Sequence, residues 1–315
     1  MHPVLIVGAT GLLGSEISRL LRGSGRHVRG LVRPGSPGEE FLRRIGAEIV
    51  PGDLRDVRSL ERACRGVSTV VSTASAVRPR LPGDSLRSVD RDGQRALVDA
   101  ARRGGVRRFV YLSVSPNLPR ATPLVRCKRD IEMTVRGSGM AWVIVQPSAF
   151  MEVWLRPRAG FDATAGKAVV VGSGEARVSY ISRLDVAKVV ARVVPMDSDV
   201  TRTNLPLGGP EPASTMDVVR AFEERSGRRF RVAHVPAMMV RGMGFLGRPF
   251  LPTASSLMGM AAHTAIHGDV IEQTETVRGL LPCPKTIRDF VREEARAALT
   301  ERVRVLIGGA GGTRV

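Results

Sequence analysis

Three glycines near the start of the chain have the spacing of a phosphate-binding loop. They lie in Gly8-Ala9-Thr10-Gly11-Leu12-Leu13-Gly14, between the apolar run 4–7 and a helical pattern. In such a loop the first glycine permits a tight turn, the second lets the backbone approach a pyrophosphate, and the third lets the helix pack against the strand. The alternative is a glycine-rich turn without a ligand. The position of the loop after a first strand predicts a dinucleotide site that contains Gly8, Thr10, Gly11, Leu12, Leu13 and Gly14.

The end of the second predicted strand carries a positive charge. Leu31-Val32-Arg33 lies about twenty residues after the glycine loop, where NAD-binding proteins place a carboxylate against the ribose 2′-hydroxyl. No acidic residue occurs between Glu16 and Glu39. A guanidinium hydrogen-bonds a 2′-phosphate, whereas a carboxylate would repel it. Arg33 therefore favours NADP(H) over NAD(H), unless it is an incidental arginine of an arginine-rich surface.

Lys128 is the first candidate for proton transfer. It is the sole lysine in the first half of a chain that otherwise uses arginine. A desolvated lysine can lose its proton near neutral pH, but an arginine stays protonated. We therefore interpret Lys128 as a catalytic residue. The alternative is a solvated helix lysine that pairs with Glu132 one turn later.

Serine and histidine side chains complete the set of reactive candidates. Ser113 and Ser115 end or follow the fifth predicted strand. Ser115 is placed to hydrogen-bond a substrate carbonyl, and Ser113 either shares this role or supports the backbone. His263 and His267 lie four residues apart on one predicted helix, but no HExxH glutamate and no third ligand accompanies them. We therefore predict no metal and expect His263 to line a pocket.

Alternating strands and helices must position these residues. Short apolar runs predict strands at 4–7, 28–32, 48–50, 69–72, 109–113 and 142–145, and helical patterns predict helices at 12–23, 39–45, 57–64, 88–103 and 123–136. Strands of this length separated by helices imply βαβ units and a parallel sheet with helices on both faces. The predicted fold class is therefore α/β, with a doubly wound Rossmann sheet.

The second half of the chain follows a looser pattern. Short strands are predicted at 168–171 and 177–181, and helices at 184–193, 215–226 and 255–266. We expect an NADP-binding Rossmann domain over 1–150, a smaller α/β substrate-binding subdomain over 151–298 that interleaves with the sheet, and a flexible glycine-rich tail over 299–315. A group of methionines is interpreted as core packing, with a ligand pocket as the alternative. The group comprises Met238, Met239, Met243, Met258 and Met260.

Composition narrows the class of protein. The 315 residues are 43% hydrophobic and 25% charged, as in ordinary soluble proteins, and no apolar run is long enough to span a bilayer. The net charge of +18 comes from arginines scattered along the chain, without a basic and aromatic motif for RNA. Three cysteines without CxxC spacing indicate neither disulfides nor zinc. We expect a cytoplasmic monomer or homodimer with a small-molecule partner, no specific nucleic-acid partner and no membrane partner.

Several motifs occur in an order that is typical of one family. They are Gly8-Ala9-Thr10-Gly11, Leu31-Val32-Arg33, Gly52-Asp53-Leu54, Phe109-Val110-Tyr111-Leu112-Ser113, Lys128 with Glu132, Gln146-Pro147-Ser148-Ala149-Phe150-Met151-Glu152, Tyr180-Ile181-Ser182, Asp185-Val186-Ala187 and Leu207-Gly208-Gly209-Pro210. With these motifs the sequence resembles the NmrA-like group of atypical short-chain dehydrogenases/reductases, which includes isoflavone-reductase-like enzymes. The resemblance covers residue 1 to about residue 295. It indicates the fold and the cofactor but says almost nothing about the substrate.

The resemblance implies where NADP(H) would bind. Asp53-Leu54 would border the adenine, although Asp53 is also a candidate helix cap. Thr73-Ala74 would lie beside the nicotinamide ribose, and Pro147 and Phe150 would lie against the nicotinamide. These residues end or follow predicted strands, which is where ligands of such sheets bind.

An apolar wall is expected beside the cofactor. Phe150, Met151 and Trp154 would line a substrate pocket, together with His263 from a later helix. Their alternative is ordinary core packing, which is the default for such residues. A wall of this kind suits an aromatic or polyketide-like substrate.

The sequence departs from the better-known short-chain reductases at one position. Those enzymes use Tyr-x-x-x-Lys, in which the lysine binds the ribose of the cofactor and the phenol protonates a forming alkoxide; the resemblance therefore implies that Lys128 also binds the cofactor. Lys128 fits the lysine, but Leu124 stands where the tyrosine would be, and leucine cannot transfer a proton. The first hypothesis is an NADPH-dependent oxidoreductase that reduces a carbonyl, quinone or conjugated double bond with the help of Lys128 and Ser115. A cofactor-sensing regulator without turnover and a non-redox isomerase or lyase are the alternatives.

Overall fold

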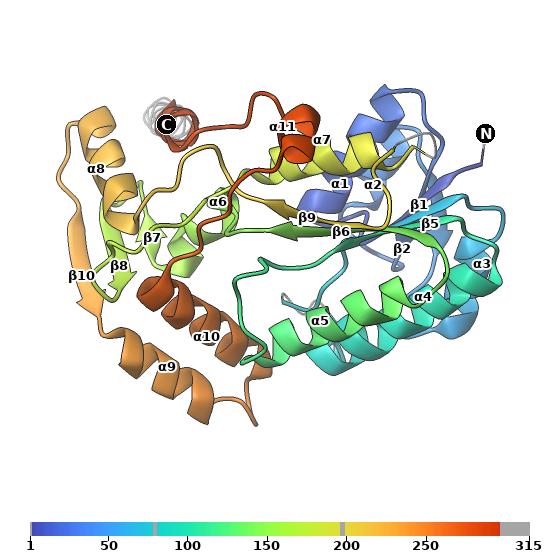
Figure 1. Cartoon of the computed structure of the whole chain (residues 1–315), viewed down its shortest axis with the longest axis horizontal. Coiled ribbons are helices and arrows are strands. Elements are labelled where there is room, and N and C mark those ends of the chain that lie inside the picture. Colours follow the sequence, from blue (N-terminus) through green and yellow to red (C-terminus); the bar gives the residue numbers. More distant parts are fainter. Residues whose placement is uncertain (1, 78–80, 196–198, 297–315) are drawn as a thin grey trace, which may run out of the picture.

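Seven parallel strands form the central sheet of the molecule (Figure 1). The computed structural model describes residues 2–77, 81–195 and 199–296; the tail predicted at 299–315 lies outside these residues. All neighbouring strands in the sheet are parallel, which confirms the predicted doubly wound α/β fold. The strand order is β3 (Glu48–Pro51), β2 (Val28–Val32), β1 (Val4–Val7), β4 (Thr69–Ser72), β5 (Arg108–Leu112), β6 (Ala141–Pro147) and β9 (Thr203–Leu207).

Helices cover both faces of this sheet, as Figure 1 shows. One face carries α1 (Leu12–Gly23), α2 (Glu39–Arg44), α7 (Arg183–Val193) and α11 (Glu275–Leu280), and the other carries α3 (Val57–Cys64), α4 (Gln94–Arg103) and α5 (Pro123–Arg136). In β1, Val4 and Ile6 belong to one core cluster, whereas Leu5 and Val7 belong to the other. Because both faces are covered, the strand is apolar at every position.

The second half builds a small additional sheet and also returns to the large one. The small sheet contains β10 (Arg231–Val235), β8 (Lys167–Val171) and β7 (Phe161–Asp162), and α8 (Thr215–Ser226) packs Phe222 against Phe161 with ring centroids 5.4 Å apart. The short helix α6 (Met151–Trp154) follows β6 directly. Strand β9 and helix α7 then join the large sheet, so that residues beyond 150 complete the sheet formed by the first half.

One predicted element is absent, and another has a different start and geometry. The strand expected at 177–181 is absent because its backbone N–H groups bond to three separate segments: Val178 to Ala213, Ser179 to Asp269, and Ile181 to Ala149. The helix expected at 88–103 begins earlier, with a wider π-helical segment, Leu86–Gly93, that precedes α4. A capping box between Ser85 and Ser88 starts this segment.

A helical hairpin of α9 (Ala237–Leu246) and α10 (Pro252–His267) projects from the lower edge of the view in Figure 1. The two helices approach closely at Gly244, where a Cβ atom would lie 3.1 Å from the Cβ of Met258. Met238, Met239 and Met243 are 65%, 52% and 53% exposed, so the interpretation of these methionines as core packing is wrong. No helix within the described ranges is long and apolar enough to cross a membrane.

Candidate active site

The glycine loop forms a tight backbone cradle between β1 and α1. Gly8 has a φ of +87°, and a Cβ atom there would lie 2.8 Å from both the Thr73 Oγ1 and the Ala74 backbone nitrogen. A Cβ atom on Gly14 would lie 2.2 Å from the carbonyl oxygen of Gly8. Helix α1 begins after Gly11 without a side-chain cap and without an acidic residue in its first turn. Its first N–H groups are therefore available to an anion such as a pyrophosphate.

A cavity of about 330 Å³, which we term the nucleotide cavity, opens beside this cradle. It lies at the carboxyl ends of β1, β2, β3 and β4, where a doubly wound sheet binds its ligand. Leu13 and Gly14 do not line it; Leu13 packs into the core, and Gly14 supports the loop from behind. The predicted cofactor residues that do line it are Gly8, Thr10, Gly11, Leu12, Arg33, Asp53, Leu54, Thr73 and Ala74.

Four charged side chains form a cluster in the wall of the nucleotide cavity. Arg33 Nη1 donates to both carboxylate oxygens of Asp84, at 3.0 and 2.9 Å. Arg55 donates to both oxygens of Asp53, at 3.0 and 2.9 Å, and lies 3.6 Å from Asp84. Burial would raise the pKa of Asp53, but the hydrogen bonds and charge of Arg55 outweigh it, and this pKa is lowered. Asp53 caps no helix; Asp56 caps α3.

Two members of this charge cluster were not found from the sequence. Asp84 follows Arg33 by 51 residues, so no local pattern connects them. Arg55 is one of many arginines in the chain and carries no distinguishing motif. A third cation, Arg183, donates to the Leu12 carbonyl oxygen at 3.2 Å and so lies at the start of α1. Two of these arginines are balanced by Asp53 and Asp84, whereas Arg183 contacts a carbonyl oxygen at the start of α1.

Lys128 lies behind the nucleotide cavity rather than on a solvated helix face. It is 4% exposed, and its Nζ lies 3.6 Å from the Asp90 Oδ1 and donates to the Leu112 carbonyl oxygen at 3.2 Å. The other oxygen of Asp90 accepts from the backbone N–H of Ala76 at 2.8 Å, and Ala76 lines the nucleotide cavity. Lys128 and this cavity are therefore connected through Asp90, which the π-helical segment carries.

Glu132 has other partners, so the alternative pairing of Lys128 with Glu132 is wrong. Its Oε1 accepts from the Ser113 hydroxyl at 2.5 Å, from Arg129 at 2.6 Å and from Gln146 at 3.0 Å. Ser113 thereby ties the end of β5 to α5.

Tyr111 and Leu124 are the neighbours that bear on proton transfer. The Lys128 Nζ lies 5.1 Å from the centroid of the Tyr111 ring. Burial, followed by the negative charges of Asp90 and Glu132, raises the pKa of Tyr111 well above its usual value. Leu124 is buried, and its backbone N–H donates to Ser256. The neutral phenol of Tyr111 is therefore a weak acid, and Leu124 supplies no hydroxyl in its place.

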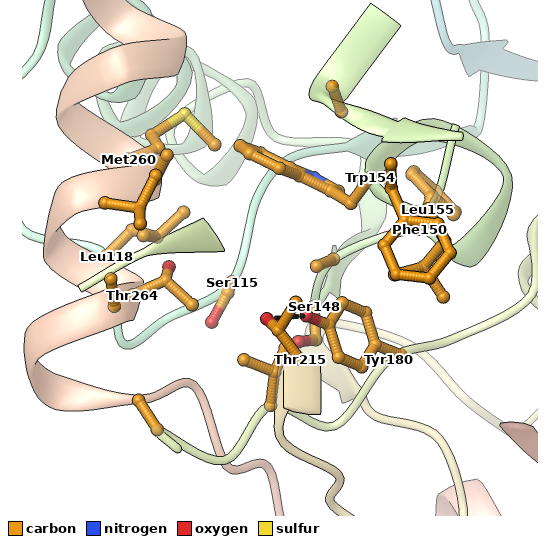
Figure 2. Close-up of a pocket in the computed structure, with 18 of the residues that line it drawn as sticks. Ser115, Leu118, Ser148, Phe150, Trp154, Leu155, Tyr180, Thr215, Met260 and Thr264 are labelled. Carbon is orange, nitrogen blue, oxygen red and sulfur yellow. Dashed lines mark hydrogen bonds between the residues drawn. The ribbon is translucent and has the colours of Figure 1, made fainter. Parts of the chain in front are cut away.

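A second cavity of about 200 Å³, which we term the apolar cavity, lies at the carboxyl ends of β5 and β6. Figure 2 shows Phe150 and Trp154 on one side of it and Leu118, Met260 and Thr264 on the other. The predicted residues Ser113, Ser115, Pro147, Phe150 and Trp154 all line this cavity.

Two residues expected in the substrate pocket lie elsewhere. Met151 is fully buried in the core cluster of the second half. His263 lines a third cavity of about 600 Å³ between α9, α10 and residues 118–125. Burial, followed by the charge of His267, lowers the pKa of His263. Neither side chain is among the described residues that line the apolar cavity.

A buried carboxylate, Asp269, organises the polar end of the apolar cavity. The hydroxyl of Ser115 donates to its Oδ1 at 2.5 Å, and the hydroxyl of Ser148 donates to its Oδ2 at 2.7 Å. The amide of Asn117 adds a third donor at 2.9 Å. Because both hydroxyl protons point to Asp269, each serine oxygen offers lone pairs to a molecule in the cavity. The geometry favours an accepting role over the donating role expected for Ser115.

The two cavities share α6 as a wall. Val153 of this helix lines the nucleotide cavity, and the next residue, Trp154, lines the apolar cavity. Both cavities lie at the carboxyl edge of the sheet, on the two sides of this helix. The fold and the site therefore define a Rossmann-class protein with a dinucleotide-type cradle beside a separate apolar cavity.

Comparison with known proteins assigns the family. Residues 2–290 match the model of the NmrA-like family, and the chain belongs to this family. The photosystem II assembly factor Ycf39 of Synechocystis sp. is 30% identical over 253 residues, which cover 78% of this chain and 74% of that protein. The NAD(P)H azoreductase of Xenophilus azovorans is 30% identical over 250 residues, which cover 78% and 82%. These relatives confirm the family resemblance seen in the motifs.

A solved structure shows the same fold. The NADPH-dependent quinone oxidoreductase QOR2 of Escherichia coli, complexed with NADPH, superimposes with a TM-score of 0.74 at 20% identity. The superposition covers 92% of this chain and 99% of that chain. The shared fold therefore includes the second half of the chain.

Proposed function

We propose that the protein is an NADPH-dependent reductase of a neutral, apolar small molecule. The observation that carries this proposal is the shared wall of α6, with a nucleotide cavity on one side and an apolar cavity on the other. Two similar proteins support the proposal, because one is named an NAD(P)H azoreductase and the other an NADPH-dependent quinone oxidoreductase. When bound, NADPH supplies a hydride to a carbonyl, a quinone or a conjugated double bond.

The proposal assigns cofactor binding, proton transfer and exclusion of water to particular residues of the chain. The loop from Gly8 to Gly14 binds the pyrophosphate, and Arg33 binds the 2′-phosphate. Lys128 positions the wall of the nucleotide cavity through Asp90 and Ala76, and we assign to its Nζ the proton of the reaction. The apolar cavity excludes water around the reacting carbon, and none of the described side chains that line it is charged. This lining favours an aromatic or polyketide-like molecule over an ionised one.

A panel of acceptors tests the proposal. NADPH oxidation is followed with naphthoquinones, aromatic ketones and azo dyes, each with the wild-type chain and with a heat-inactivated sample. We expect turnover with at least one aromatic class. Saturable NADPH binding without oxidation across the whole panel would reject the reductase.

That result would favour a second function, an NADP(H)-binding protein that acts through a partner. Leu124 in place of a tyrosine supports this alternative, as does the placement of Lys128 behind the cavity wall. The relative named as a photosystem II assembly factor shows that an assembly role occurs among similar chains.

The charge cluster predicts how cofactor preference can be changed. Asp84 neutralises Arg33 and would repel a 2′-phosphate, so Asp84→Asn is expected to lower the dissociation constant of NADPH roughly tenfold, or about 1.4 kcal/mol. NADH lacks this phosphate, and its affinity should change much less. Arg33→Ala should weaken NADPH selectively. Fluorescence titration of both cofactors measures the effect, with the exposed Asp99→Asn as control; an unchanged ratio of the two constants in Asp84→Asn would contradict it.

The Asp269 arrangement predicts a preference for substrates that carry a hydroxyl group. In Asp269→Asn the amide oxygen can still accept from one of the two serines, but the NH2 group cannot accept from the other, so the proton of that other serine turns toward the cavity. We expect KM for 6-hydroxy-1,4-naphthoquinone, whose hydroxyl has no hydrogen-bond partner within the molecule, to rise roughly tenfold, the usual cost of a mispaired hydrogen bond, while KM for 1,4-naphthoquinone changes little. Ser148→Ala should change the same ratio less strongly, with Asp99→Asn as control. Equal effects on both quinones would indicate that Asp269 only stabilises the fold.

A further inference from the structure

The helical hairpin carries an unusual concentration of exposed apolar side chains. Half of the large apolar residues that are exposed among the described residues fall within residues 238–251. Phe250 is 84% exposed and Leu246 is 75% exposed. We define the hairpin patch as the seven such residues of this segment: Met238, Met239, Met243, Phe245, Leu246, Phe250 and Leu251. Seven exposed large apolar side chains within fourteen residues are a concentration that is typical of a contact site.

The charged residues of the hairpin patch segment are all arginines. No aspartate or glutamate occurs between residues 225 and 268, whereas Arg241 and Arg248 lie within the patch segment. Neither arginine forms an ion pair with a carboxylate in the part of the chain that the structure describes. The Arg248 guanidinium lies 4.7 Å from the centroid of the Phe245 ring, so positive charge and apolar surface are directly adjacent.

We propose that the hairpin patch docks the protein on the surface of an anionic membrane. Apolar side chains enter the boundary between headgroups and acyl chains, and arginines beside them bind anionic headgroups. The patch offers both features on one element, at the edge of the molecule (Figure 1). This proposal departs from the expectation of no membrane partner and does not depend on the proposed reductase activity.

A second copy of the chain fits the patch less well. Each copy carries a net charge of +18, and two identical patches would bring Arg241 and Arg248 of both copies together. The patch segment has no carboxylate that could compensate them. An anionic bilayer supplies the missing negative charge, and its interior accepts the apolar residues without a complementary shape.

Vesicle sedimentation of the full chain tests this proposal. Vesicles of phosphatidylglycerol and phosphatidylcholine are compared with vesicles of phosphatidylcholine alone. We expect the wild type to bind the anionic vesicles, and Leu246→Ser with Phe250→Ser to lower its partition coefficient about tenfold or more. The matched control replaces two exposed apolar residues far from the hairpin, Val57→Ser with Met133→Ser, and should bind like the wild type.

Further variants keep the test decisive. Arg241→Gln should weaken binding to anionic vesicles while leaving the melting temperature unchanged, and Arg241→Gln with Arg248→Gln should weaken it further. Met239→Ser with Met243→Ser serves as a second patch variant should the first fail to fold. Equal binding by folded patch variants and wild type would overturn the proposal. So would a wild-type dimer, measured by light scattering, that the patch variants dissociate in the absence of any vesicle binding.

Discussion

Gly14→Ala is expected to abolish NADPH binding. The added Cβ would lie 2.2 Å from the Gly8 carbonyl oxygen and 2.8 Å from the Gly8 carbonyl carbon. Both atoms belong to the backbone and cannot rotate away, so the start of α1 must move off the loop. We expect the dissociation constant of NADPH to rise by roughly a hundredfold or more and the free energy of unfolding to fall by about 3 kcal/mol. Cofactor titration and chemical denaturation measure the two effects.

The same helix supplies the control for this prediction. Gly23 lies at the other end of α1, and a Cβ atom there has no atom within 4 Å. Gly23→Ala should therefore leave NADPH binding unchanged and raise the free energy of unfolding by up to about 1 kcal/mol, because alanine has the higher helix propensity. Retention of wild-type NADPH affinity in Gly14→Ala would show that the cradle does not hold the cofactor.

Lys128→Met is expected to reduce both stability and turnover. It leaves the buried carboxylate of Asp90 without its counter-charge, which costs about 3–5 kcal/mol of folding free energy. Turnover should fall by roughly a hundredfold or more, because a positioned proton carrier contributes at least that factor. The loss of stability alone would not identify a role in the reaction.

The double variant Lys128→Met with Asp90→Asn separates the two effects. The amide oxygen that replaces a carboxylate oxygen of Asp90 can still accept from Ala76, and no unpaired charge remains, so most of the stability should return. Turnover should stay low if Lys128 acts on the ribose or the proton. Recovery of turnover together with stability would assign Lys128 a purely structural role. Lys167→Met, at an exposed lysine of β8, is the control and should cost less than about 1 kcal/mol.

The nucleotide side of the site could be predicted because its signals are local. Four residues that line the nucleotide cavity each follow a short apolar run that predicts a strand: Gly8, Arg33, Asp53 and Thr73. Parallel strands bring their carboxyl ends to one edge of the sheet. The partners of these residues could not be predicted. Asp84 lies 51 residues after Arg33 in the sequence, and Asp269 lies 154 residues after Ser115. Such contacts depend on the completed fold and leave no periodic pattern in the sequence.

The second half was harder to predict for a physical reason. Strand β9 contains Pro206 and has a neighbour on one side only, β6, so it lacks the apolar run of a central strand. The methionines of α9 have the composition of a core helix, but α10 covers only one side of that helix and the rest is exposed. The apolar composition of a segment shows that its side chains could be buried. Whether they are buried depends on which elements of the fold pack against them.

The position of the Asp90 carboxylate depends on the number of residues in the π-helical segment before α4. A wide turn accommodates one residue more than an α-helical turn, and each residue of an α-helix adds a rotation of about 100°. Removing a single residue from Leu86–Gly93 would restore an ordinary helical register and rotate the flanking side chains by that angle. Asp90 would then leave both Lys128 and the Ala76 N–H. The pairing therefore rests on the number of residues in this turn as much as on the chemical identity of the aspartate.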